Sequence, residues 1–107
     1  AAKALLEHTS KPDAVFCAND ILAMGVIDGL RQLGCNIPQD FAIMGVDDIP
    51  MASWPSYDLT TIAQPVDKIV QRAVEDLMQR INDNVDAQGE YLLEPGTIIE
   101  RGSTQAR

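Results

Sequence analysis

The sequence predicts an α/β fold in which helices flank a largely parallel sheet. Apolar runs at 14–18 and 41–46 are short and bounded by polar residues, as is typical of strands covered on both faces. Amphipathic segments at 20–33 and 67–82 alternate with such runs and place apolar residues at helical spacing. Strands that alternate with helices favour parallel pairing, because each helical crossover returns the chain to the same end of the sheet.

Turn residues set the order of the predicted elements. Pro12 disfavours helical backbone at the residue before it, and Pro65 ends the third apolar run. In chain order we expect a helix at 1–8, a strand at 14–18, a helix at 20–33, a strand at 41–46, a helical turn at 49–53, a strand at 59–63, a helix at 67–82, and strands at 91–93 and 97–100.

The helix after the first strand has a predicted cap and two distinct faces. Either Asn19 or Asp20 can cap its start, and Gly34 lies just past its end. Ile21 and Met24 point away from the predicted core, which indicates a surface for a partner. The predicted core face of this helix comprises Ala23, Val26, Ile27, Leu30 and Leu33.

Length and charge exclude several classes of protein. With 107 residues the chain is long enough for one domain with a single core. Its net charge of −8 repels a phosphate backbone, so we expect the chain itself not to bind DNA or RNA. No apolar run approaches the roughly 18 residues of a membrane span, and we expect no membrane partner.

Asparagine and aspartate stand directly after the first two predicted strands, as Asn19–Asp20 and Asp47–Asp48. In an open parallel sheet, ligands bind beyond the carboxyl ends of the strands. Carboxylates accept hydrogen bonds from adjacent hydroxyls, an amide donates and accepts, and the indole of Trp54 suits an apolar C–H face. This combination predicts a site for a neutral polyol.

Each of these residues also has a purely structural explanation. Asn19 or Asp20 is explained equally well as a helix cap, and the pair at 47–48 as a turn. A catalytic, proton-sharing pair formed by Asp47 and Asp48 would need surroundings that separate their two pKa values, and a sequence does not show such surroundings. Trp54, the single tryptophan, is more often a core or interface residue than a ligand contact.

Catalytic and metal-binding patterns are absent from the sequence. It contains no GxSxG, P-loop or GxGxxG motif, so we expect no enzyme activity and no catalytic residue. The single histidine, His8, and the cysteines Cys17 and Cys35 lack zinc-ligand spacing, and we expect neither a metal nor a cofactor. Unpaired cysteines favour a reducing compartment.

Several segments of the chain occur in the order and at the spacing of a known family: 12–20, 23–25, 33–34, 37–40, 44–50, 59–65 and 100–104. Together they resemble the effector domain of lactose-repressor-type (LacI/GalR family) transcription regulators. The resemblance implies the C-terminal lobe portion of a type I periplasmic-binding-protein-like fold, in which two α/β lobes close on a small ligand. It implies a C-terminal lobe at 1–63, a crossover, helix and strand at 64–95 that pack on the N-terminal lobe, and a return strand and tail at 96–107.

The resemblance also implies ligand contacts. In the family, the positions that match Asn19 and Asp47 hold the effector, commonly a sugar, a nucleoside or a purine. Gln64 matches a position near the cleft between the lobes. With the indole of Trp54 added from its own chemistry, these four residues are the expected effector contacts.

Subunit pairing is a second expectation from the resemblance. The helix face that carries Ile21 and Met24, and the loop near Trp54, correspond to places where subunits of the family pair. We therefore expect a homodimer. Such regulators often place proline two positions before the Leu-Thr-Thr run, where this chain has Tyr57, so its loop at 54–58 can follow a different path.

We therefore predict an effector-sensing part of a cytoplasmic DNA-binding repressor. Ligand binding would shift the balance between two lobe arrangements, and an N-terminal domain would contact the DNA. One alternative is the solute-binding component of a periplasmic sugar transporter (ABC type), which shares the fold. Another is a hydrolase that uses Asp47 and Asp48.

The second amphipathic helix lacks its usual cover if the other lobe is absent. Exposing its apolar stripe would leave a patch that soluble monomers seldom tolerate. We expect the helix to fold back on this chain's own sheet or to bury the stripe against another copy. The predicted stripe comprises Ile69, Val70, Ala73, Leu77 and Ile81.

Overall fold

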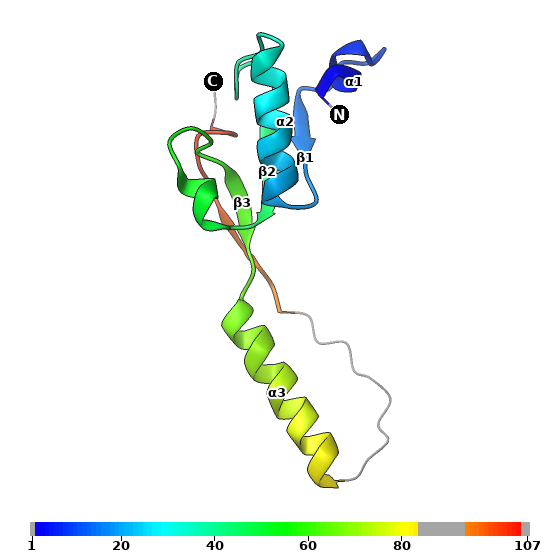
Figure 1. The fold of residues 1–107 in the computed structure, drawn as a ribbon, viewed down its shortest axis with the longest axis vertical. Coiled ribbons are helices and arrows are strands. Elements are labelled where there is room, and N and C mark those ends of the chain that lie inside the picture. The colour runs from blue at the N-terminus through cyan, green and yellow to red at the C-terminus, as the bar shows by residue number, and fades with distance from the viewer. Residues whose placement is uncertain (1, 84–93, 106–107) are drawn as a thin grey trace. The chain divides into compact units, whose positions relative to one another are not determined.

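The computed structural model describes residues 2–83 and 94–105 (Figure 1). They form two compact units: unit 1 contains Ala1–Ala63 and Ile98–Arg107, and unit 2 contains Gln64–Thr97. The strand predicted at 91–93 lies outside the described residues. The elements are α1 (Ala2–Glu7), β1 (Ala14–Phe16), α2 (Asp20–Gln32), β2 (Ala42–Asp47), the 3₁₀ helix η1 (Pro50–Ser53), β3 (Thr60–Ala63), α3 (Val66–Asp83) and β4 (Thr97–Ile99).

The sheet has the strand order β1-β2-β3-β4. The first three strands pair in parallel, with Val15 opposite Ile43 and Met44 opposite Thr60. The chain then returns through β4 in the opposite direction (Figure 1). This arrangement confirms the predicted α/β class with a largely parallel sheet.

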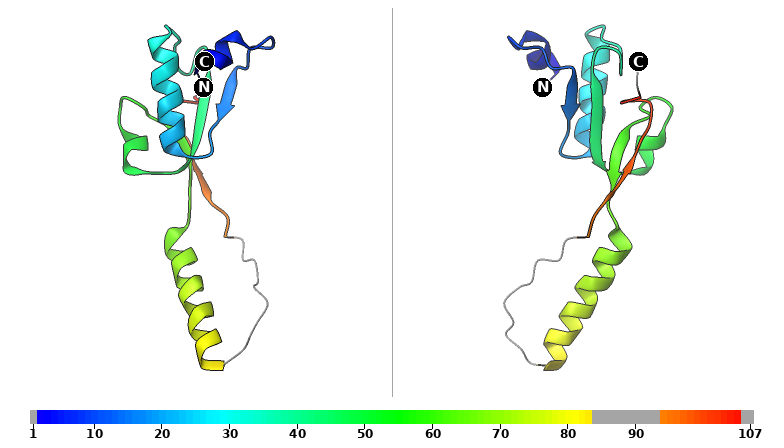
Figure 2. Two further views of the ribbon diagram at one scale, coloured as in Figure 1. Left: turned by 45° about the vertical axis from the view of Figure 1, so that its right-hand side comes forward. Right: turned by 180° about the vertical axis from the view of Figure 1, so that it is seen from behind.

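The core of unit 1 lies between α2 and one face of the sheet. Figure 2 shows α2 running along that face. Apolar side chains from the inner side of α2 are removed from water there, which stabilises the amphipathic helix against the sheet. The buried cluster comprises Cys17, Ala23, Ile27, Leu30, Phe41, Ile43, Ala52 and Leu59.

The expectation that the first strand is covered on both faces is wrong for this chain. Phe16 in β1 has 64% of its surface exposed. In β2 the pattern alternates, with Ile43 and Gly45 buried and Met44 and Val46 only half-buried. Strand side chains alternate between the two faces, and among the described residues α2 provides close cover for only one of them.

The ends of α2 agree with the sequence. Asn19 is the N-cap, because its Oδ1 accepts a hydrogen bond from the Leu22 N–H at 2.9 Å. Gly34 follows the helix with φ +82°, in the left-handed region that glycine adopts without strain, and its N–H donates to the Arg31 carbonyl at 2.9 Å.

The predicted core face of α2 is confirmed at Ala23, Ile27 and Leu30, which are buried, and two other predictions for this helix are wrong. Met24, expected to point outward, is only 8% exposed, whereas Leu33 is exposed. Leu33 is the C-cap residue with non-helical backbone, so a helical wheel extended to it places its side chain wrongly on the core face. Ile21 is exposed, as expected.

Unit 2 contains the long helix α3, and none of its residues is buried. The expectation that this helix folds back on the sheet or buries its stripe against another copy stays a prediction. No helix within residues 2–83 and 94–105 combines enough length and apolar character to span a bilayer. The exposed large apolar residues of α3 are Val66, Ile69, Val70, Val74, Leu77, Met78 and Ile81.

We predict that the 107-residue chain self-associates through α3, because its exposed apolar face gains most from removal from water. Leu77→Lys should shift the population toward monomer, as measured by light scattering coupled to size-exclusion chromatography. Gln71→Lys is the matched control, since Gln71 lies on the same helix and bonds Glu75 instead of belonging to the apolar face. A wild-type chain that is monomeric at tens of micromolar would contradict this prediction.

Candidate functional site

The strand register brings the ends of β1 and β2 to the same edge of the sheet. Phe16 pairs with Met44, and Asn19 and Asp47 each lie three residues beyond these partners. The two predicted ligand contacts therefore follow neighbouring parallel strands at the carboxyl edge, where α/β sheets bind ligands.

Asn19 has two kinds of polar group, and the helix uses one of them. Its Oδ1 caps α2, which orients the side chain at the start of the helix. The side-chain NH₂ group of Asn19 takes no part in the capping bond and can donate hydrogen bonds. The half-buried Asn19 thus serves as a cap while presenting donors at the edge of the sheet.

Asp47 and Asp48 form a strained turn at the end of β2. Their φ angles are +119° and +53°, conformations that residues with a Cβ rarely adopt. Each such residue costs about 1–3 kcal/mol, so the turn persists only where its surroundings hold it. Asp47 is exposed, whereas Asp48 is half-buried.

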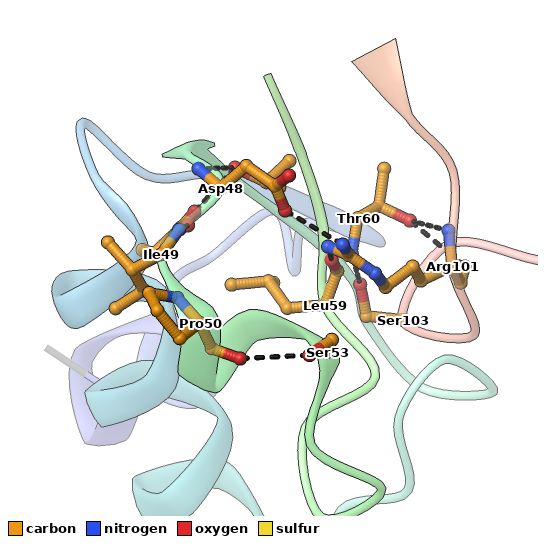
Figure 3. Close-up of polar contacts among 10 residues, drawn as sticks. Asp48, Ile49, Pro50, Ser53, Leu59, Thr60, Arg101 and Ser103 are labelled. Carbon is orange, nitrogen blue, oxygen red and sulfur yellow. Dashed lines mark hydrogen bonds and ion pairs between the residues drawn. The ribbon is translucent and has the colours of Figure 1, made fainter. Parts of the chain in front are cut away.

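Arg101 holds the turn from the C-terminal segment (Figure 3). Its Nη2 donates to Oδ1 of Asp48 at 2.7 Å, and its Nη1 donates to the Leu59 carbonyl at 2.8 Å. The Arg101 main chain is fixed by Thr60, whose Oγ1 accepts from the Arg101 N–H at 2.8 Å and donates to the Arg101 carbonyl at 2.9 Å. The carboxylate of Asp48 is therefore held by Arg101, whereas Asp47 is exposed at the surface.

The C-terminal segment is anchored one turn further on by Ser103. The buried Ser103 Oγ donates to the Ile43 carbonyl at 2.6 Å and accepts from the Thr60 N–H at 2.8 Å. Because these two residues belong to β2 and β3, Ser103 ties the tail to both strands. The sequence marked this segment only through its resemblance to a family, with no physical signal of its own.

Asp20 has more contacts than the helix-start role that the sequence predicts for it. It begins α2, as expected, but its carboxylate is fully buried. Oδ2 accepts from the Ile49 N–H at 2.9 Å, and Oδ1 accepts from the Thr61 hydroxyl at 2.6 Å. A charged residue at a helix start normally faces water, so burial of this one had no sequence signal.

Trp54 is not part of the strand register and lies in the loop that follows η1. Its indole is 53% exposed, and its carbonyl accepts from the N–H groups of Tyr57 and Asp58, both at 2.8 Å. The loop packs on α2 through the Tyr57 hydroxyl, which donates to Oδ2 of Asp28 at 3.1 Å. This hydrogen bond raises the pKa of Tyr57.

Gln64 is the first residue of unit 2 and is exposed. Its expected role as an effector contact stays a prediction. In the described part of the chain, no group of three or more histidine, cysteine or acidic side chains is placed to hold a metal ion.

The geometry gives no support to the hydrolase alternative. Asp48 is committed to Arg101 in an ion pair, so it and Asp47 have different surroundings and do not form a proton-sharing pair. What remains at this edge is a donor from Asn19 and an exposed carboxylate from Asp47. These groups give this α/β unit a polar carboxyl edge, the part of such a sheet where ligands bind in α/β proteins.

Comparison with known proteins places the chain in a family. The family model described as periplasmic binding protein-like domain matches residues 1–104, and the chain belongs to that family. The chain is 42% identical over 103 residues to the ribose operon repressor of Escherichia coli strain K12, covering 96% of this chain and 31% of the repressor. It is 36% identical over 99 residues to the repressor PurR of Vibrio vulnificus, covering 92% of this chain and 30% of PurR.

A solved structure gives the same result. The LacI family transcriptional regulator of Enterococcus faecium, determined with bound ribose, matches with a TM-score of 0.79 and 36% identity. The match covers 96% of this chain and 37% of that one. The predicted resemblance to lactose-repressor-type regulators is confirmed, and the chain spans about a third of the length of these proteins.

We predict that Arg101 stabilises unit 1 through its two-sided contact with Asp48 and Leu59. Arg101→Lys removes the planar fork while keeping the charge, and should lower the free energy of unfolding by about 1–2 kcal/mol. Urea unfolding followed by the fluorescence of the single tryptophan, Trp54, measures the loss.

The matched control is Glu7→Gln, which removes a surface ion pair between Glu7 and Lys3 at 3.7 Å. Exposed pairs of this kind contribute about 0.5 kcal/mol or less. Equal losses for the two variants would show that the Arg101 contact behaves as an ordinary surface pair.

Proposed function

We propose that this chain is the C-terminal part of the effector-binding domain of a LacI-type transcriptional repressor, and that Asn19 and Asp47 contact an uncharged sugar. The observation that carries the proposal is the register, which sets Asn19 and Asp47 at equal positions beyond neighbouring parallel strands. The similarity to named repressors supports the regulatory class.

The chemistry of the edge favours a sugar over an anionic ligand. The exposed Asp47 carboxylate accepts hydrogen bonds from two adjacent hydroxyls, and the Asn19 amide donates to a ring or hydroxyl oxygen. The chain's net charge of −8 disfavours a phosphate or carboxylate ligand. Ribose is the first probe, because a relative is named for the ribose operon and a solved neighbour holds ribose. Nucleosides and purines are the next classes.

Trp54 and Gln64 complete the proposed effector contacts. The exposed indole of Trp54 offers an apolar face for the C–H side of a sugar, and Gln64 follows directly after Ala63, the register partner of Asp47. We assign 1–63 to the C-terminal lobe, 64–95 to a segment that packs on the N-terminal lobe, and 96–107 to the return strand and tail.

Sensing in this proposal is differential binding. The sugar binds one arrangement of the two lobes better than the other, and this difference changes the DNA affinity of an N-terminal domain. The protein acts in the cytoplasm, where DNA is found, and performs no catalysis. A sugar-transport component is the second candidate for the fold, but the named relatives above are repressors.

We predict that Asp47→Asn weakens ribose binding by the full-length protein about 10- to 100-fold and that Asn19→Ser weakens it less. Loss of a hydrogen bond to the charged Asp47 costs about 1.5–3 kcal/mol, which converts to that range, whereas loss of the neutral Asn19 amide costs about 0.5–1.5 kcal/mol and puts Asn19→Ser at or below its lower end. Serine keeps the helix cap and removes the amide, so Asn19→Ser separates ligand contact from capping. Isothermal titration calorimetry measures both affinities.

Asp28→Asn is the control, because it makes the same carboxylate-to-amide change on the outer side of α2. It should leave the affinity within about twofold. If ribose, hexoses, nucleosides and purines all fail to bind the wild-type protein, or if Asp47→Asn binds as tightly as wild type, the proposed site is wrong.

We also propose that the outer side of α2 pairs with the same surface of a second copy. The exposed Ile21 and Leu22 flank Gly25 and line an apolar hollow of about 400 Å³ with Cys17 and Val26. Exposed apolar surface of this kind marks association sites. Met24, proposed with Ile21 and Trp54, offers little surface because it is nearly buried.

Ile21→Lys in the full-length protein should raise the dimer dissociation constant at least tenfold in analytical ultracentrifugation, since a lysine there is desolvated on pairing. Gln39→Lys, an equally exposed position in the loop after α2, should leave it unchanged. A tight dimer that tolerates Ile21→Lys would place the interface elsewhere.

A further inference from the structure

We infer that Asp20 is a positioning residue for the effector site: its buried carboxylate sets the Asp47–Asp48 turn in the conformation that presents Asp47 to the ligand. The inference rests on the proposed function for its link to ligand binding. Its structural part stands on hydrogen bonds alone.

The backbone N–H groups of Asp48 and Ile49, the two residues after Asp47, are both connected to Asp20 by hydrogen bonds. The Ile49 N–H donates directly to Oδ2 of Asp20 at 2.9 Å. The Asp48 N–H donates to the Thr61 Oγ1 at 3.3 Å, and the Thr61 hydroxyl donates its own proton to Oδ1 of Asp20 at 2.6 Å. Because the hydroxyl proton points at Asp20, an oxygen lone pair of Thr61 is left to accept from Asp48.

The sheet is built to admit this carboxylate. Gly45 lies two residues before Asp47 in β2, and a Cβ at that position would collide with Oδ1 of Asp20. Thr61, opposite Gly45 in the parallel register, is also fully buried. A glycine on one strand and a hydroxyl on the next thus form a polar niche that fits one carboxylate from α2.

Asp20 therefore connects three elements at a single point. It starts α2 next to the proposed ligand contact Asn19, it binds the loop after β2, and it binds β3 through Thr61. The β1–β2 register sets where Asn19 and Asp47 follow their strands, and the contacts of Asp20 fix the backbone of the loop after Asp47 relative to the start of α2. Arg101 reaches the same turn only through the Asp48 side chain and leaves both N–H groups to Asp20 and Thr61.

A role confined to general stability predicts a different outcome from a positioning role. Amide hydrogen exchange of the ligand-free, full-length protein separates them. In Asp20→Ala, the Asp48 and Ile49 amides should exchange at least tenfold faster, while the Ile43 amide, which donates to the Ser103 carbonyl in the core, should change less than twofold. Equal acceleration of all three amides would overturn the positioning role.

Thr61→Val keeps the shape of the side chain and removes only the hydroxyl. It should accelerate exchange at Asp48 and leave Ile49 protected, because Asp20 binds Ile49 directly. Fast exchange at Ile49 in Thr61→Val would contradict the inference that Asp20 protects the Ile49 amide without help from Thr61.

Calorimetry with D-ribose tests the link to the ligand. Asp20→Ala should weaken binding at least tenfold, and Asp20→Asn, which keeps one acceptor oxygen, should give an intermediate affinity. Ile27→Val, a buried change on the same helix with no polar contact to the turn, should remain within twofold.

The outcomes separate the two proposals. If the wild-type protein binds none of the sugars, nucleosides or purines, the proposed function fails, while the exchange data still decide what Asp20 does to the turn. If ribose binds and Asp20→Ala binds as tightly as Ile27→Val, the inference fails while the proposed function stands.

Discussion

Left-handed backbone at Asp47 and Asp48 is the constraint around which unit 1 is organised. Two consecutive residues with a Cβ adopt positive φ at the end of β2, and this strain has to be offset by neighbouring contacts. Asp20 contributes from α2 and Arg101 from the C-terminal segment. The helix, the central strands and the tail thus meet where the sheet presents its carboxyl edge.

The same contacts divide two adjacent carboxylates into different roles. Asp48 faces inward to Arg101 and stabilises the lobe, whereas Asp47 stays exposed beside the end of β1. If Asp47 contacts the ligand as proposed, one turn serves both folding and recognition. The different surroundings of the two acids also weaken any catalytic interpretation, because a proton-sharing pair requires two acids in mutual contact. The arrangement suits a lobe that binds and senses.

The order of the elements, the parallel pairing, the Asn19 cap and the two acidic strand ends follow from sequence patterns, since all are local or depend on hydrophobic spacing. The inward carboxylate of Asp20 does not, because it depends on Gly45 and Thr61 from two other strands. Leu33 is exposed because it lies beyond the helix, and the burial of Met24 depends on packing that a helical wheel does not describe. Phe16 and the apolar side chains of α3 are exposed. An apolar sequence pattern that is typical of a buried surface therefore does not guarantee that other residues cover it.

A nuclear magnetic resonance titration of the full-length protein with ribose tests most directly whether Asn19 and Asp47 belong to one binding site. The account predicts that the Asn19 side-chain NH₂ and the Asp48 backbone amide shift together, with the same concentration dependence. The amide of Gln39, in the loop before β2, should not move. Shifts confined to one of the two signals, or saturation at different ribose concentrations, would contradict a shared site at the carboxyl edge of the sheet.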